Sequence, residues 1–131
     1  MEQPLTLGEL ELALLDHLWE VGPRDVKAAH QAVGAPKGIT LNTVQSALKR
    51  LNEKELLTRE KVSHAYLYAP AIDRAELHRR LLGQVVDSLM GGQPEAMVSA
   101  FVDLAEQAGP EQLDRLEQLI AARRGKTGAG E

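Results

Sequence analysis

The stretch ITLNTVQSALKRLNEKELLTREKVSHAYLYAP, from Ile39 to Pro70, contains the pattern that decides the fold. Thr40 is placed to cap a helix, because its hydroxyl can accept a hydrogen bond from an amide of the first turn. The apolar residues that follow recur at helical spacing and form one stripe: Val44, Ala47, Leu48 and Leu51. Apolar and polar residues then alternate on both sides of a tip at Lys61 to His64, which is typical of two strands joined by a turn. The stretch therefore predicts a helix followed by a β-hairpin.

Two helices are expected upstream of this stretch. In the first, Thr6 is the expected N-cap with Glu9 at N3, and the helix ends at Gly22-Pro23. Its expected apolar stripe is Leu7, Leu10, Leu14, Leu18 and Val21, and its expected polar side is Glu9, Glu11, Asp16 and Glu20. In the second, Asp25 is the expected N-cap, the helix ends at Gly34, and APKG forms a loop. The buried residues of this second helix are expected to be Val26, Ala29 and Val33.

The C-terminal half is expected to be helical. Asp73 with Glu76 repeats the capping pattern and opens a helix that closes at Gly91-Gly92, and Pro94 and Pro110 are placed to begin two more helices. The apolar stripes of the three helices are Leu77, Leu81, Val85 and Leu89, then Met97, Phe101 and Leu104, then Leu113, Leu116 and Ile120. Single amphipathic helices of this length are marginal alone, so these faces need partners. A monomer's own core and an interface between two copies remain alternatives.

The polar face of the central helix has the composition of a surface that reads DNA. The major groove of B-DNA admits one α-helix, whose side chains hydrogen-bond to base edges. Small hydrogen-bonding residues stand here in place of the Glu and Lys that are usual on a solvated face: Asn42, Thr43, Gln45 and Ser46. Lys49 and Arg50 follow them and are placed to hold phosphates, with an intramolecular ion pair as the alternative role for Arg50. The hairpin, with Lys61, Ser63 and His64 at its tip, would then be a wing.

The charge distribution supports this interpretation locally. The whole chain has a formal net charge of -4, which gives no general reason to expect nucleic acid. Between Arg24 and Lys61, however, eight basic residues stand against four acidic ones. The region that contains the central helix and the hairpin is therefore the basic part of an acidic chain.

Composition also argues against other classes of protein. A chain of 131 residues suits one compact domain, or a small domain with a helical appendage. Because there is no cysteine, disulfides, thiolate metal sites and thiol nucleophiles are excluded, and the four histidines lack the spacing of metal ligands. There is no Ser/His/Asp order and no phosphate-binding glycine loop, so we expect no enzyme, cofactor, metal or small-molecule substrate. With no secretion signal and no apolar run of roughly 20 residues, we expect a cytoplasmic protein.

Two segments, TVQSALKRLNEKELLTRE and YLYAP, resemble the central motif of the penicillinase repressor family of winged-helix regulators. That motif is Thr-Val-x-Thr/Ser-x-Leu-x-Arg-Leu-x-x-Lys-Gly-x-Leu-x-Arg, followed by Tyr-x-Tyr-x-Pro. The segment LGELELALLDHLWE is similar to the first helix of the family, and LMGGQPEAMVSAFVDLAEQAGPEQLDRLEQLI is similar to its dimerisation helices. The resemblance covers about Leu5 to Arg124.

The resemblance implies a mainly α fold with a winged helix-turn-helix domain of three helices and a β-hairpin wing (1–72) and a helical dimerisation region (73–124). The residues that follow, GKTGAGE, are expected to form a disordered tail (125–131). It implies a homodimeric repressor that binds a palindromic operator in double-stranded DNA. The implied base contacts are Asn42, Thr43, Gln45 and Ser46, and the implied backbone and wing contacts are Lys49, Arg50, Lys61, Ser63, His64 and Tyr66. The implied dimer contacts are the residues of the three C-terminal stripes. A winged helix that serves as a protein-interaction module, without sequence-specific DNA binding, is the alternative function.

The resemblance also suggests how repression could be relieved. In the antibiotic-responsive branch of the family, a membrane-bound sensor protease system leads to cleavage within the C-terminal helices, at a bond that aligns here with Ala100-Phe101. Phe101 is at least as well explained as part of a dimer core. The copper-responsive branch uses a cysteine cluster, which this chain lacks.

Two departures from the family pattern have physical consequences. Glu55 follows Lys54 where the family usually has Gly, and a left-handed Glu55 would cost about 1 kcal/mol relative to Gly. Ser63-His64 replaces the Gly-Arg often found at the wing tip. Because this removes a permanent cation, we expect a wing contact that is weaker or that depends on pH.

Overall fold

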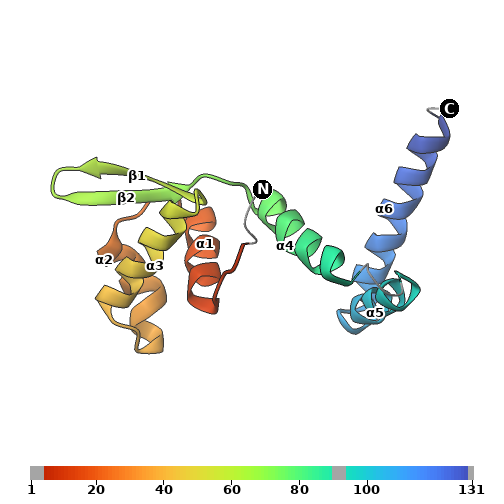
Figure 1. Ribbon diagram of the computed structural model, residues 1–131, viewed down its shortest axis with the longest axis horizontal. Coiled ribbons are helices and arrows are strands. Elements are labelled where there is room, and N and C mark those ends of the chain that lie inside the picture. The colour runs from red at the N-terminus through yellow and green to blue at the C-terminus, as the bar shows by residue number, and fades with distance from the viewer. Residues whose placement is uncertain (1–4, 90–93, 130–131) are drawn as a thin grey trace. The chain divides into compact units, whose positions relative to one another are not determined.

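The computed structural model describes residues 5–89 and 94–129, and the chain divides into two compact units, Met1–Gln84 and Val85–Glu131 (Figure 1). The first unit contains α1 (Glu9–Val21), α2 (Val26–Ala29), a π-helical turn η1 (His30–Gly34), a 3-10 turn η2 (Ala35–Lys37), α3 (Leu41–Glu53), and the strands β1 (Leu57–Val62) and β2 (Ala65–Pro70). Helix α4 (Arg74–Leu89) begins in this unit, and the second unit adds α5 (Pro94–Gln107) and α6 (Pro110–Ala129). This is the expected mainly helical winged helix-turn-helix with additional C-terminal helices.

One hydrophobic core holds the first unit together. The expected stripe of α3 is completely buried, and α1, α2, the hairpin and the start of α4 pack around it. The buried apolar residues of the unit are Leu14, Leu15, Leu18, Ala29, Val33, Val44, Ala47, Leu48, Leu51, Leu56, Leu57, Tyr68 and Leu77. Because each fully buried leucine stabilises the folded state by about 2 kcal/mol, this core determines how α3 is oriented.

Helix α1 differs from the expected helix in its start and in its buried side. It begins at Glu9 after Gly8, which lacks a capping side chain, so the predicted Thr6 cap is wrong. The buried side is shifted as well, because Leu15 joins the core while Val21, at the last turn, is 36 % exposed. Glu11 was expected on the polar side but is buried, because the residues that face the core are Glu11, Leu14, Leu15 and Leu18, at helical spacing.

Helix α2 is capped as predicted but ends differently. The Asp25 carboxylate accepts a hydrogen bond from the Ala28 amide at 2.8 Å. The helical backbone then continues through η1, which ends at Gly34, and through η2, and it stops at Gly38, which is left-handed with φ 72°. Gly34 is needed for close packing, since a Cβ there would lie 2.6 Å from Cγ2 of Val44 and 2.9 Å from Cδ2 of His30. The predicted APKG loop is wrong, because Gly34 has helical angles (φ -84°, ψ -51°) and a 3-10 turn follows it directly.

Both ends of α3 are closed by hydrogen bonds. At its start the Thr40 hydroxyl accepts from the Thr43 amide at 3.2 Å, as predicted. At its end Glu55 is left-handed with φ 65°, its amide donates to the Asn52 carbonyl, and the Leu56 amide donates to the Leu51 carbonyl, both at 3.0 Å. This is a Schellman motif with the buried Leu51 and Leu56 in apolar contact positions. Of the two helix ends considered for Glu55, the left-handed one is therefore present.

The hairpin pairs β1 with β2 antiparallel, from Leu57 opposite Pro70 to Val62 opposite Ala65. The turn consists of two residues, Ser63 and His64, and Ser63 has φ 60°. A positive φ at the first loop residue alone is the pattern of a type II′ turn, which prefers Gly at that position. Arg24 extends the sheet by one residue, because its amide and carbonyl both bond to Tyr68 at 3.0 and 2.8 Å.

The boundary between the two units falls within α4, at Gln84, rather than before this helix at residue 72. Helix α4 starts as predicted, with the Asp73 carboxylate accepting from the Glu76 amide at 2.8 Å. Its first turns belong to the first unit, because Leu77 is fully buried there and the Gln84 amide bonds to both backbone groups of Leu5. Trp19 also anchors the start of α4, because its indole nitrogen donates to the carbonyl of Ile72 at 2.9 Å.

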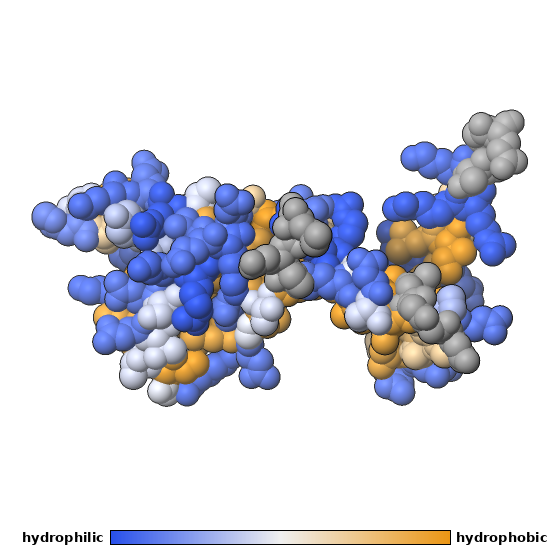
Figure 2. Space-filling model, in the orientation of Figure 1, coloured by the Kyte–Doolittle hydropathy of each residue, from blue (hydrophilic) through white to orange (hydrophobic). Residues whose placement is uncertain are grey.

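In the second unit, α5 and α6 begin at Pro94 and Pro110 as predicted and pack against each other. The predicted helix closure at Gly91-Gly92 lies outside the described residues. The expected disordered tail (125–131) is helical as far as Ala129. Apolar side chains of this unit are exposed in the single chain: Val85, Val86, Leu89, Val98, Phe101, Val102, Leu104, Leu119 and Ile120. Figure 2 shows apolar surface on this unit. Within the described residues, no helix has the length and apolar character required to cross a membrane.

The strained end of α3 generates a prediction about stability. Replacing Glu55 by Gly should raise the free energy of unfolding by about 1 kcal/mol, because Gly adopts a positive φ without a steric penalty. Urea unfolding followed by circular dichroism measures the change. Glu55→Ala is the matched control, since it removes the carboxylate but keeps the Cβ. Equal stabilisation by Ala and Gly would show that charge, and not backbone strain, is responsible.

Candidate nucleic-acid interface

The face of α3 opposite the core is polar and exposed. The predicted DNA-facing residues of this helix are all exposed: Asn42, Thr43, Gln45, Ser46, Lys49 and Arg50. Asn42, Ser46 and Lys49 recur at intervals of four and three residues and so lie along one line of this face. Thr43 belongs partly to the cap, because its hydroxyl lies 2.9 Å from that of Thr40. The helix thus presents amide, hydroxyl and ammonium groups to solvent on one side.

A buried carboxylate ties the C-terminal part of α3 to α1. Glu11 is only 8 % exposed, and its Oε2 lies 2.8 Å from Nζ of Lys54. The same ammonium group donates to the carbonyl of Thr6 at 2.6 Å. A buried charge needs a partner of opposite sign, which explains why Glu11 is tolerated on the apolar side of α1. Lys54 is therefore committed to holding α3 in place.

Arg50 stands at the edge of the same cluster. Its Nε lies 3.8 Å from Oε1 of Glu11, so the ion pair considered as its alternative role is present. Its side chain is nevertheless 51 % exposed, which leaves part of the guanidinium open to an outside anion. The side chain of Lys49, by contrast, has no hydrogen bond or ion pair with any other residue that the structure describes. The Lys49 ammonium group is thus a cation on the exposed face that no described residue pairs with.

The wing and α3 share a groove of about 480 Å³ with the start of α2. Gln45 and Leu41 line it from α3, and Ser63, His64 and Tyr66 line it from the hairpin. The remaining lining residues are Asp25, Val26, Lys27, Val62, Ala65 and Tyr68. The structure therefore brings Gln45 together with three of the predicted wing residues, whereas Asn42, Ser46 and Lys49 lie outside this groove. Sequence reasoning missed the contributions of α2 and Leu41, because neither the groove nor its depth follows from helix periodicity.

The stem of the wing carries an arginine that the sequence analysis did not select. The guanidinium of Arg59 lies 4.4 Å from the ring centroid of Tyr66. Tyr66 is 39 % exposed, and its ring centroid is 6.5 Å from that of Tyr68, which is buried. Lys61 belongs to β1 rather than to the turn and pairs with Tyr66. The strand register, which places Arg59 opposite Tyr68, is the signal that could have identified this arginine from the sequence.

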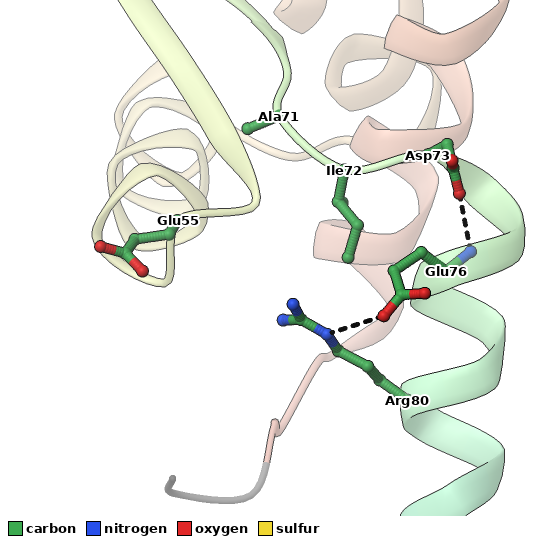
Figure 3. Close-up of a pocket in the computed structure, with 6 residues that line it drawn as sticks. All are labelled: Glu55, Ala71, Ile72, Asp73, Glu76 and Arg80. Carbon is green, nitrogen blue, oxygen red and sulfur yellow. Dashed lines mark hydrogen bonds and ion pairs between the residues drawn. The ribbon is translucent and has the colours of Figure 1, made fainter.

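A second hollow of about 470 Å³ lies between the end of α3 and the start of α4 (Figure 3). Its charged residues are Glu55, Asp73, Glu76 and Arg80. Two of them serve the helix itself, because Asp73 caps α4 and Arg80 pairs with Glu76 at 3.5 Å, as the dashed lines of Figure 3 show. Within the described residues, no group of three or more His, Asp or Glu side chains is arranged to hold a metal ion.

These features define a winged helix-turn-helix protein with an exposed polar helix and an adjacent wing, which is a DNA-binding class. The chain belongs to the penicillinase repressor family, whose model matches residues 7–122. It is therefore a DNA-binding transcriptional repressor of that family and not an enzyme.

Known relatives agree with this assignment. Over 117 residues the chain is 33 % identical to the transcriptional regulator BlaI of Mycobacterium tuberculosis, in strains CDC 1551 / Oshkosh and ATCC 25618 / H37Rv. The match covers 88 % of this chain and 83 % of the relative. The solution structure of the DNA binding domain of the repressor BlaI superposes with a TM-score of 0.51 at 21 % identity. That match covers 58 % of this chain and 93 % of the other, and it supports the fold.

The cluster around Glu11 generates a second prediction. Replacing Lys54 by Met should lower the free energy of unfolding by about 2 kcal/mol, because a buried carboxylate then loses its closest cation. Adding Glu11→Gln to Lys54→Met should restore part of the loss, because no buried charge is left unpaired. Urea unfolding of both single variants and the double variant measures the coupling. Lys49→Met, an exposed cation on the same helix, should change stability by less than about 0.5 kcal/mol, and additive losses at Glu11 and Lys54 would contradict the proposed pairing.

Proposed function

We propose that the chain acts as a homodimer that represses transcription by reading a palindromic operator, with α3 of each copy in the major groove and the wing beside it. The observation that carries this proposal is the exposed face of α3, on which small hydrogen-bonding side chains lie opposite a completely buried apolar stripe. A repressor of this kind is expected to act on DNA in the cytoplasm.

The proposed readers of base edges are Asn42, Thr43, Gln45 and Ser46. Asn and Gln can pair in a bidentate manner with adenine, whereas Ser and Thr hydroxyls can donate hydrogen bonds to, or accept them from, several base edges. Lys49 and the exposed part of Arg50 are proposed to neutralise phosphates and so to set the register of the helix on the duplex. The proposed wing contacts are Lys61, Ser63, His64 and Tyr66.

The homodimer is proposed because one small module has limited DNA affinity. Joining two modules gives the second one a high effective concentration at the other half-site, and half-sites about one helical turn apart present the groove on the same side. The exposed apolar residues of the second unit support the proposal, since a chain alone would leave them in water. Of the expected interface residues, Val85, Leu89, Phe101, Leu104 and Ile120 are exposed, and Met97, Leu113 and Leu116 are partly buried. Leu77 is fully buried in the first unit, and Leu81 packs against the core of that unit. Leu77 therefore has no exposed surface that could contact a second copy.

Release from DNA is proposed to follow cleavage of the Ala100–Phe101 bond by a membrane-bound sensor protease system. Both residues are exposed in the middle of α5. A bond inside a helix reaches a protease after local unfolding, and a short helix with few buried contacts opens at low free energy. Cleavage would separate Phe101, Leu104 and all of α6 from the rest of the chain. Loss of these residues would weaken the dimer and, through it, operator binding.

A selection from random DNA duplexes tests the proposed function. The wild-type protein should enrich a palindrome, because two copies of α3 read equivalent half-sites. Gln45→Ala should weaken the base preference at one position of each half-site, because binding to the preferred base loses about 1–3 kcal/mol. Lys49→Ala should instead weaken all sequences alike and reduce the slope of log affinity against log salt by roughly one.

Absence of any enriched sequence at modest salt would overturn the proposal. The winged helix would then serve as a protein-interaction module. Enrichment of a single half-site without symmetry would contradict the dimer but not the reading role of α3.

The oligomeric state provides a separate prediction. Leu104→Glu should shift the protein from dimer to monomer in sedimentation equilibrium, because a charge would be buried in the proposed apolar interface. Operator affinity should fall at least tenfold with it, because the second half-site is no longer held nearby. Glu106→Gln, an exposed polar change on the same helix, is the control. A chain that ends at Ala100, the expected cleavage product, should behave like Leu104→Glu, and a dimeric Leu104→Glu or a dimeric truncated chain would contradict the proposed interface.

A further inference from the structure

The wing carries permanent cations in its stem even though its tip has none. In the hairpin, Arg59 stands opposite Tyr68 and Lys61 stands opposite Tyr66. Residues that are directly opposed in an antiparallel pair place their side chains on the same face of the ribbon. Arg59, Lys61 and both tyrosines therefore share one face of the wing.

Arg59 is held in place by this aromatic pair. Its guanidinium lies 4.4 Å from the centroid of the Tyr66 ring, and the Tyr66 ring centroid lies 6.5 Å from that of Tyr68. Tyr68 is 3 % exposed and bonds through its backbone to Arg24, so the stack is anchored in the core. A guanidinium that stacks through its face keeps N–H donors at its edge, and these donors match the geometry of a phosphate.

The position of the stack relative to α3 points to its ligand. Tyr66 and Tyr68 line the groove that also contains Gln45, and Arg59 shares their face of the wing. Arg59 is exposed, and no acidic residue in the described part of the chain forms an ion pair with it. A duplex read by Gln45 would therefore pass beside an arginine whose charge is not neutralised within the protein.

We infer that Arg59, positioned by Tyr66, is the phosphate-binding cation of the wing and takes the place of the cation that is missing at the Ser63-His64 tip. The ligand is a phosphate of the DNA strand that flanks the bases read by Gln45. This inference rests on the proposed function, because it assumes that α3 reads the major groove. Tyr66 then acts as a positioning residue, and His64 is not the main source of wing affinity.

The test measures affinity for the selected operator as a function of salt. Arg59→Ala should weaken binding to all sequences alike and reduce the slope of log affinity against log salt by about 0.9, the value for one lost phosphate contact. The matched control is Arg115→Ala, which removes an exposed arginine of α6 and should leave the slope unchanged, while His64→Ala tests whether the tip makes the contact instead. Tyr66→Phe should keep the wild-type salt slope because it keeps the ring that positions Arg59, whereas Tyr66→Leu should lower affinity although Arg59 is still present. Arg59→Lys should keep the slope but lose affinity, because an ammonium group cannot bind phosphate in a bidentate manner.

The outcomes separate this inference from the proposed function. Salt-dependent operator binding by the wild type together with an unchanged slope for Arg59→Ala would overturn the inference and leave the proposed function standing. A slope that falls with His64→Ala and not with Arg59→Ala would assign the contact to the tip instead. If the wild type does not bind any operator, both the proposed function and the inference about Arg59 are overturned. Circular dichroism checks that each variant is folded, and if Tyr66→Leu unfolds, the pair Arg59→Ala and Arg59→Lys decides the question.

Discussion

Burial of one side of α3 is the constraint on which the rest of the molecule depends. Val44, Ala47, Leu48 and Leu51 are completely buried, so the helix cannot rotate about its axis without exposing apolar surface. Because side chains are distributed around a helix at regular angles, the same burial determines which residues face outward. Core packing and the proposed reading of DNA are therefore two results of one orientation.

The ends of α3 show how that orientation is maintained. Thr40 satisfies an amide of the first turn, and the Schellman motif around Glu55 satisfies carbonyls of the last turn. Between α3 and α1, the ion pair of Lys54 with Glu11 adds a polar restraint to the apolar one. A helix held at both ends and along one side can position side chains on a rigid element, which is what direct readout of base edges requires.

Local patterns predicted most of the fold, and long-range partners account for what they missed. The stripe of α3, the hairpin, and the caps at Asp25 and Asp73 depend on residues a few positions apart, so periodicity and capping rules identify them. The burial of Glu11 was missed because its cation comes from a distant helix, and the role of Gly34 was missed because it depends on how closely α3 approaches. For the candidate site, helix periodicity identified the exposed face of α3, whereas Arg59 became evident from the pairing of two strands.

The left-handed Glu55 has a consequence for the history of the chain. Codons for Glu and Gly differ by a single base, so the change that would relieve the backbone strain is one nucleotide away. The chain nevertheless keeps Glu at a position with φ 65°. Natural proteins are held above a threshold of stability and not at its maximum, so Glu55 marks a position where a substitution would still raise the free energy of unfolding. A change of Glu55 to Gly would offset a mildly destabilising substitution on the outer face of α3, so that a new operator preference could evolve without loss of the fold.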